Sequence, residues 1–347
     1  MRRQTEFSFG PVALTLDRRL LLVGTGLAVA AVAAFLVSIA IGFTSPVDVA
    51  RILLGGGTRA ENVVVFDDAL PRALVAALVG FGLGLAGALT QTITRNPLAT
   101  PDLLGITAGA GFGAVLAITT TGSWAAGRGV GTAALLGGLA AAAVMYLLSL
   151  RRGSDVGMST LRLILIGVGL TWMLQALTGY LLVRAQEWDA ARAQRWIVGS
   201  VSLATWQVVP AAAAAVLIGL GWAVVAGRDL RALGLGQDLA RSLGVRVGPM
   251  TAGTLLVAVV VASLAVSAAG PIAFVGLLAP QIGMRLTGTA QPTPVAAGFT
   301  GALLVLAADI VLRTVLPAGL PVGVVTAAVG GPFLIYLMVQ ASRKATA

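Results

Sequence analysis

The residue types that most often do chemistry in proteins are nearly absent from this chain of 347 residues. It has no cysteine and no histidine, which excludes thiol nucleophiles, histidine acid–base catalysis and most zinc or haem ligation. Lys344 is the single lysine, so the ATPase phosphate-binding loop, which needs a lysine, is absent. We therefore expect no enzyme activity, no metal site and no cofactor in this chain, with ATP and magnesium held by other subunits.

The remaining polar residues cluster at a few places in apolar sequence. Thr171, Gln175 and Thr178 recur at i, i+4 and i+7 with Trp172 beside them, which predicts one polar face on a membrane helix. Such a face either lines a water-filled path or forms hydrogen bonds with a neighbouring helix. Upstream, Ser159 or Thr160 is well placed to cap the start of the same helix.

Residues 228–249 have the pattern of a short amphipathic helix. Its apolar face would consist of Leu235, Leu239 and Leu243. The polar side chains opposite them are Asp238, Arg241 and Ser242. Gly236 and Gly244 would delimit the helix. It could dock on a protein partner or lie on the lipid surface.

Composition identifies the elements that must position these residues. Hydrophobic residues make up 58% of the chain and charged residues only 10%, which is typical of a membrane protein surrounded by lipid. We expect an all-α, polytopic integral membrane protein with about ten transmembrane helices, at 20–42, 70–91, 103–121, 130–150, 162–183, 205–227, 250–268, 271–287, 295–313 and 320–340. The eighth is short and contains Pro280, so it is expected to be broken or re-entrant. This domain, 20–340, lies between short segments at 1–19 and 341–347.

The charge distribution predicts the orientation. With the N-terminus inside, cytoplasmic segments hold 15 of the 23 basic residues against 6 of the 13 acidic ones, which leaves 8 basic and 7 acidic residues outside. This asymmetry follows the positive-inside rule and places both termini in the cytoplasm. It accounts for the net charge of +10 without nucleic acid as a partner. Arg72 and Arg313 then lie at external helix ends, where arginine side chains often reach toward the membrane surface.

Four ordered blocks resemble a known family. They are LPRALVAALVGFGLGLAGALTQTITRNPLATPDLLGITAGAGFG at 70–113, LGLGQDLARSLGVRVG at 233–248, AGPIAFVGLLAPQIGMRLTG at 269–288 and ADIVLRTVLPAGLPVGVVTAAVGGPFL at 308–334. The chain is similar to the permease subunits of iron-siderophore and cobalamin ABC importers, the type II importers. Ala69 and Gln281 replace a common arginine and a common histidine of that family. The sequence looks more like the second permease chain of ferric-catecholate siderophore systems.

This resemblance implies a function and a set of partners. It implies import of a ferric siderophore through the bacterial inner membrane, together with a second, probably non-identical permease chain, two ATPase subunits and an extracytoplasmic binding protein. It also implies that the 228–249 helix couples to the ATPase, that Ser159 and Thr160 form a cytoplasmic gate, and that Thr171, Trp172, Gln175 and Thr178 line the translocation path. Arg72 and Arg313 would receive acidic residues of the binding protein. Cobalamin or haem is the alternative cargo.

Two other classes are less consistent with the residues present. An ion-coupled secondary transporter needs embedded carboxylates or broken helices, and Asp309, one turn before Arg313, is the one strong candidate. A membrane-embedded enzyme would need a nucleophile, a metal set or an acid–base pair, and no such group converges in the sequence.

Overall fold

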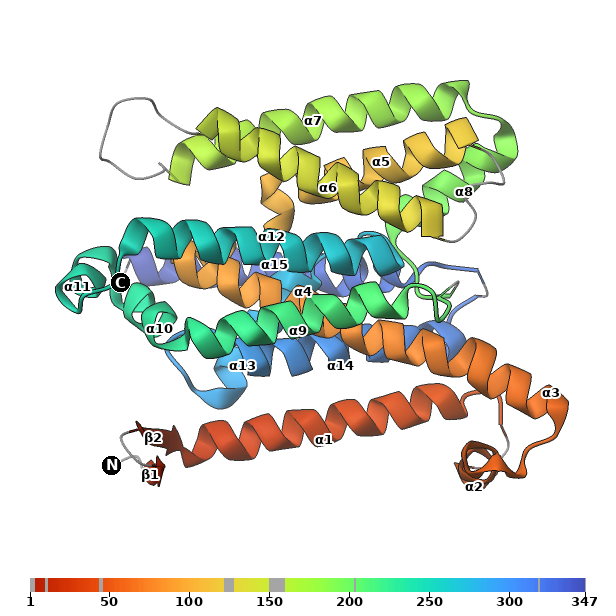
Figure 1. The fold of residues 1–347 in the computed structure, drawn as a ribbon, viewed down its shortest axis with the longest axis horizontal. Helices are drawn as coiled ribbons and strands as arrows, with labels where there is room; N and C mark the ends of the chain where they lie inside the picture. The colour runs from red at the N-terminus through yellow and green to blue at the C-terminus, as the bar shows by residue number, and fades with distance from the viewer. Residues whose placement is uncertain are drawn as a thin grey trace.

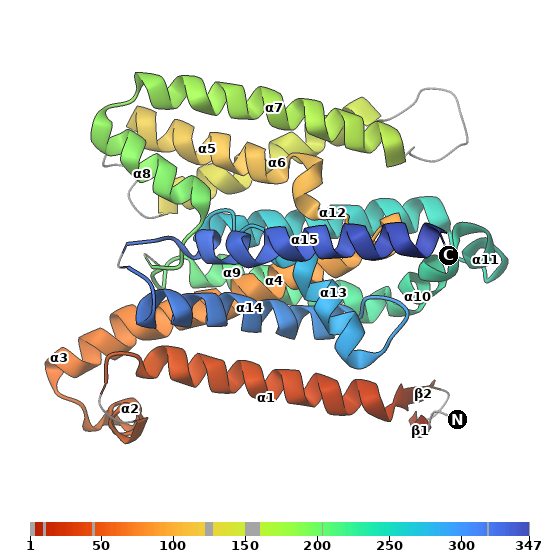
Figure 2. The ribbon, with the colours of Figure 1, turned by 180° about the vertical axis from the view of Figure 1, so that it is seen from behind.

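Long apolar helices lying side by side make up most of the structure (Figures 1 and 2). It is a computed structural model that describes residues 4–9, 12–43, 46–121, 128–149, 160–202, 204–317 and 319–346. Its α-helices are α1 (Arg18–Ala40), α2 (Pro46–Arg51), α3 (Arg59–Asn62), α4 (Leu70–Thr94), α5 (Ile106–Thr121), α6 (Arg128–Ser149), α7 (Thr160–Arg184), α8 (Glu187–Val198), α9 (Val209–Val225), α10 (Gly227–Leu235), α11 (Gln237–Ser242), α12 (Val247–Ala269), α13 (Val275–Thr287), α14 (Pro294–Thr314) and α15 (Val322–Thr346).

The predicted membrane class is confirmed, and each of the ten predicted spans overlaps a helix of the structure. Among the described residues, seven helices are long and apolar enough to cross a bilayer, and the bent pair α9–α10 would make eight. α5 and α13 coincide with two further predicted spans but are shorter. The 13 residues of α13 extend only about 20 Å, against a hydrocarbon core of about 30 Å. This agrees with the prediction that the eighth span is broken or re-entrant.

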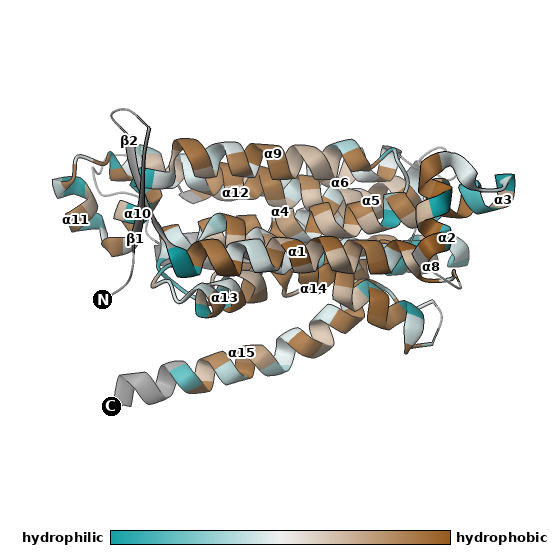
Figure 3. Cartoon of the chain, turned by 90° about the horizontal axis from the view of Figure 1, so that it is seen from below, coloured by the Kyte–Doolittle hydropathy of each residue, from teal (hydrophilic) through white to brown (hydrophobic). Residues whose placement is uncertain are grey.

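Polar residues gather at the two ends of the bundle, and apolar residues occupy its middle. Figure 3 shows largely hydrophobic α1 and α9 between the more hydrophilic α11 at one end and α3 at the other. The N-terminal strands, α11 and the last turns of α15 lie at the same end (Figures 1 and 2). Strands β1 (Gln4–Phe9) and β2 (Val12–Asp17) form an antiparallel hairpin there. No strand was predicted within residues 1–19, because polar and apolar residues alternate only over 6–9 and 14–17.

Helix α4 is the centre of the bundle, and its glycines allow neighbouring backbones to approach closely. The most apolar stretch of Arg59–Thr94, the segment that contains α4, is 83% buried, whereas that of α1 at the edge of the bundle is 6% buried. A Cβ at Gly80 or Gly84 would meet backbone atoms of α14, and one at Gly87 would overlap the carbonyl oxygen of Gly276 in α13. These glycines therefore let α4 pack closely against α13 and α14.

Replacing Gly87 with alanine is expected to destabilise the bundle by about 1–3 kcal/mol, because the added methyl group would force α4 and α13 apart. Gly179→Ala on α7 is the matched control, because its Cβ would meet no atom within 4 Å. Thermal unfolding of the two purified variants in detergent measures the difference. Equal unfolding temperatures would show that the α4–α13 contact is looser than described.

Candidate functional site

The segment expected to couple to an ATPase protrudes from one end of the bundle as two short helices. α9 and α10 form a bent pair with an angle of 71° between them. α10 ends at Leu235, and α11 begins after Gly236, whose φ of 126° favours glycine. Gly244, also at positive φ, follows the end of α11. The prediction that Gly236 and Gly244 delimit a short helix is thus confirmed.

The predicted apolar face of this helix is wrong at one position. Leu235 ends α10 and therefore does not share the helical face of Leu239 and Leu243, because Gly236 breaks the helix between them. All three leucines are nonetheless exposed, at 61%, 49% and 61% respectively. The buried side of α11 is Ala240, which packs against α10 and the start of α12. The leucines form a small uncovered apolar surface, a feature that often marks contact with another molecule.

The polar side of α11 is fully accessible. Arg241 Nη1 donates a hydrogen bond to Asp238 Oδ1 at 2.8 Å, and the two side chains are 59% and 99% exposed. Ser242 donates its hydroxyl to the carbonyl of Leu239. An ion pair this exposed contributes at most about 1 kcal/mol to stability. Its charges therefore remain available to a partner.

Helix α7 does not present its predicted polar residues on one surface. Trp172 and Gln175 are exposed, whereas Thr178 is buried. Thr171 and Thr178 donate their hydroxyls to the carbonyls one turn back, Gly167 and Leu174, at 2.8 Å each. The two threonines are thus satisfied within their own helix, and Gln175 with Trp172 forms the accessible part of the stripe. Of the expected gate, Thr160 begins α7 and Ser159 lies outside the described residues.

Arg72 and Arg313 meet at one buried carboxylate. Asp309 is 0% exposed and accepts hydrogen bonds from Arg72 Nη2 at 2.7 Å and Arg72 Nε at 3.1 Å. Arg313 Nη1 lies 3.8 Å from the other oxygen of Asp309, Oδ2. Arg313 also donates to the carbonyls of Ser38 and Ile41 at the end of α1. This Arg72–Asp309–Arg313 cluster ties α4, α14 and α1 together at the end of the bundle opposite α11.

Asp309 and Arg313 are one helical turn apart, a spacing that favours contact, but no sequence pattern indicates the shorter contact of Asp309 with Arg72. Both arginines keep only 13–16% side-chain exposure. Asp309 is thus already held in an ion-pair network. In a secondary transporter, by contrast, the carboxylate would have to be available to bind the transported ion. Among the described residues, no three acidic side chains come close enough to bind a metal ion.

A second polar cluster was not predicted. Gln281 in α13 donates to Gln91 in α4 at 2.7 Å, and Gln91 donates to the Leu277 carbonyl at 3.2 Å. Arg285 donates to Gln281 Oε1 and reaches Gln340 in α15 at 3.2 Å. Both Gln91 and Gln281 are at most 3% exposed. Gln281 was detectable in the sequence as a strongly polar residue in an apolar stretch, whereas Gln91 lies among threonines and does not stand out.

Comparison with known proteins shows that this helical arrangement is that of an ABC importer permease. A profile described as the FecCD transport family matches residues 21–340, and the chain belongs to that family. It is 39% identical to the ferric enterobactin permease protein FepG of Escherichia coli, over 84% of this chain and 87% of that protein. It is 35% identical to the cobalamin permease protein BtuC of Halobacterium salinarum, over 82% of this chain and 75% of that protein.

Solved structures agree with the fold. An inward-facing structure whose title assigns it to the metal-chelate type of ABC transporter superimposes with a TM-score of 0.77 at 28% sequence identity. The match covers 92% of this chain and 99% of the other. The fold and the family together confirm the resemblance derived from the four sequence blocks.

Proposed function

We propose that this chain is the transmembrane permease subunit of an ATP-driven importer that carries a ferric siderophore across the bacterial cytoplasmic membrane. The observation that carries the proposal is the membership of the FecCD transport family over residues 21–340. The names of its relatives support the cargo, since FepG and FepD of Escherichia coli are ferric enterobactin permease proteins and CbrC of Dickeya dadantii is an achromobactin permease protein. Cobalamin is the second candidate, because BtuC is also a relative.

The proposed assembly contains this chain, a second permease chain, two ATPase subunits and a binding protein. The similarity to both FepG and FepD, two permease proteins of one ferric enterobactin system, supports a non-identical partner. Reconstitution of the assembly in liposomes tests the function. We expect ATP-dependent uptake of a ferric catecholate siderophore, and ATP-dependent uptake of cobalamin alone would identify the second candidate.

The exposed surface of Leu235, Leu239 and Leu243 supports the coupling role proposed for α10 and α11. It would sit in a groove of the ATPase, with Arg241 and Asp238 at its polar edge. The exposed residues Trp172 and Gln175 of α7 would face the translocation path, and Thr171 and Thr178 would stabilise the helix beside it. Ser159 and Thr160 would form the cytoplasmic gate.

We further propose that the binding protein docks at Arg72 and Arg313. Because both guanidinium groups already contact Asp309, only their remaining donors can meet an acidic partner. We expect the affinity of the binding protein for the reconstituted transporter to fall as salt rises, since ion pairs made by these partly exposed arginines are screened over about 8–10 Å.

Docking through Arg313 also predicts charge rescue. Arg313→Glu should weaken binding-protein affinity, and an acidic-to-basic reversal on the binding protein should restore it. The docking measurement is interpreted only for variants that keep the wild-type unfolding temperature, because Arg313→Glu also disturbs the contact with Asp309. Salt-independent docking without rescue would assign both arginines a purely structural role.

The proposed orientation can be measured directly, because the chain has no cysteine of its own. Cysteine at exposed Gln237 on α11 is expected to react with an impermeant maleimide only from the cytoplasm. Cysteine at exposed Gln194 on α8 is expected to react only from outside. Labelling of position 194 from the cytoplasm would reverse the orientation.

A further inference from the structure

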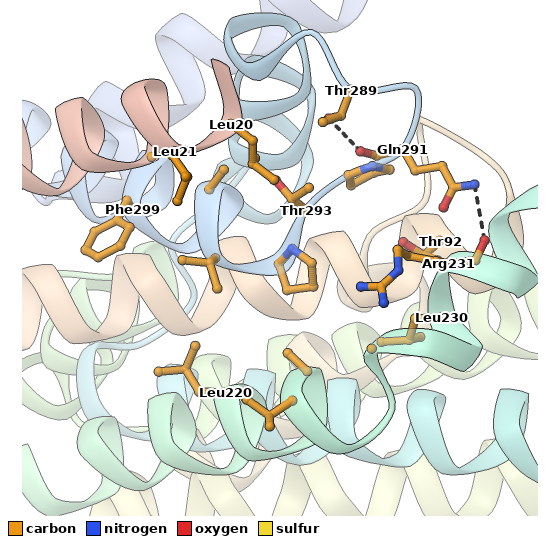
Figure 4. A pocket seen from close by; sticks show the side chains of 18 of the residues that line it. Leu20, Leu21, Thr92, Leu220, Leu230, Arg231, Thr289, Gln291, Thr293 and Phe299 are labelled. Atoms are coloured by element: carbon orange, nitrogen blue, oxygen red, sulfur yellow. Dashed lines mark hydrogen bonds between the residues drawn. The ribbon is translucent and has the colours of Figure 1, made fainter. Parts of the chain in front are cut away.

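A large groove lies between α1 and α9 at the end of the bundle that carries α10 and α11. Its volume is about 940 Å³, toward the upper end of the range for small-molecule sites, roughly 300–1,000 Å³. Helix α1 supplies Leu20, Leu21 and Gly24 to one wall, and α9 supplies Leu220 and Val224 to the other (Figure 4). Phe299 of α14 and residues of the α13–α14 loop close its inner side. The groove shares Leu235 and part of α10 with the proposed coupling segment, but it includes no residue of the proposed path or docking sites.

The surroundings of this groove are those of a lipid-facing surface. On α1, Val29 and Val32 are 63% and 57% exposed, and on α9, Leu217 and Val224 are 70% and 82% exposed. Both helices are hydrophobic along most of their length (Figure 3). In a membrane this apolar surface faces acyl chains, so the groove opens to lipid at the depth where α1 begins.

One end of the groove is positively charged. The Arg231 side chain points into it, and the wall around Arg231 is fixed by Gln291, which donates to the Arg231 carbonyl at 3.4 Å (Figure 4). Arg19 lies nearby and donates to the Leu286 carbonyl at 3.1 Å. None of the described residues that line the groove is acidic. Asp229, also on α10, lies roughly 200° around the helix axis from Arg231.

The rest of the groove completes the match to a lipid. Leu20, Leu21, Leu220 and Val224 form apolar walls, and Arg231 lies at one end of them. A phospholipid has the same order of groups, with apolar acyl chains on one side and a negatively charged phosphate on the other. The groove therefore offers an apolar surface to an acyl chain and a positive charge to the phosphate group.

We propose that this groove binds an anionic phospholipid of the cytoplasmic leaflet, with an acyl chain between α1 and α9 and the phosphate group at Arg231. The choice of leaflet rests on the proposed orientation of the permease. An anionic headgroup is favoured over a zwitterionic one because a nearby arginine attracts anionic lipid. One such arginine raises the affinity for an anionic lipid about fivefold.

The test is native mass spectrometry of the purified full chain mixed with phosphatidylglycerol or phosphatidylcholine of identical acyl chains. We expect retention of phosphatidylglycerol to exceed that of phosphatidylcholine in the wild type. Arg231→Gln should reduce this preference about fivefold. Arg228→Gln, an exposed arginine on the same helix that does not line the groove, should leave it unchanged. Equal losses in the two variants would show diffuse charge attraction and overturn the site.

A second pair of variants tests the groove itself. A Cβ at Gly24 or Gly26 would meet no atom within 4 Å, but only Gly24 lines the groove. Gly24→Phe should fill it and abolish retention of both lipids, whereas Gly26→Phe should retain them at the wild-type unfolding temperature. Unchanged retention in Gly24→Phe would refute the proposal. The measurement needs no ATPase and no siderophore, so a failed transport assay would leave this result standing.

Discussion

Asp309→Ala is expected to lower the stability of the protein by about 3–5 kcal/mol, because it leaves two largely buried arginines without their common carboxylate. Asp309 is 0% exposed and lies 2.7 Å from Arg72. Thermal unfolding in detergent measures the loss. Asp238→Asn is the control, since it breaks an ion pair whose side chains are 59% and 99% exposed and should cost no more than about 1 kcal/mol.

A double variant separates the contribution of the Arg72–Asp309 ion pair from the contributions of its two side chains. Arg72→Met combined with Asp309→Leu removes both buried charges, and Arg313 keeps the carbonyls of Ser38 and Ile41 as partners. We expect the double variant to be about 1–3 kcal/mol more stable than the sum of the single losses predicts. Additive losses would mean that Arg72 and Asp309 act independently, contrary to the contact described.

Arg241→Glu is expected to reduce the siderophore transported per ATP hydrolysed by about tenfold or more. Reversing a charge at a protein interface costs several kcal/mol when it places like charges together, and 1.4 kcal/mol already corresponds to tenfold. Membrane insertion and unfolding temperature should remain normal, because Arg241 is 59% exposed. Transport and ATP hydrolysis measured in the same reconstituted liposomes give the ratio.

The matched control for this variant is Arg18→Glu, an equal charge reversal at an exposed position at the start of α1, outside the proposed coupling segment. It should leave the ratio near the wild-type value. If Arg241→Glu also leaves the ratio of siderophore transported to ATP hydrolysed near the wild-type value, the contact with the ATPase lies on another surface. If both variants lower this ratio equally, the effect comes from cytoplasmic charge in general.

The sequence predicts the membrane class, the order of the helices and the position of the short helices proposed for coupling, because each depends on local hydrophobicity or on glycine. It predicts the extent of single helices less well. Leu235 fits a helical pattern with Leu239, yet the backbone at Gly236 places them on different helices. The predicted span at 271–287 coincides with α13, but α13 has only 13 residues, fewer than a full crossing requires.

The polar clusters are the part that sequence reasoning could not assemble. Arg72 and Asp309 are 237 residues apart, and Gln91 and Gln281 are 190 residues apart. No periodicity connects residues at such separations, because their contact depends on how α4 packs against α13 and α14. The glycines of α4 indicated close packing, but they did not identify which helix each would meet.

The separation between Arg72 and Asp309 also has a consequence for biogenesis. At about 5–20 residues per second, the ribosome reaches Asp309 on the order of 10–50 s after Arg72. During that interval the newly made α4 lacks the buried carboxylate that pairs with its arginine, and Asp68, one helical turn before Arg72, is the nearest carboxylate along the chain. A chain truncated before Asp309 would lack the ion pair that joins α4 to α14, so this link between the two helices can form only late in synthesis.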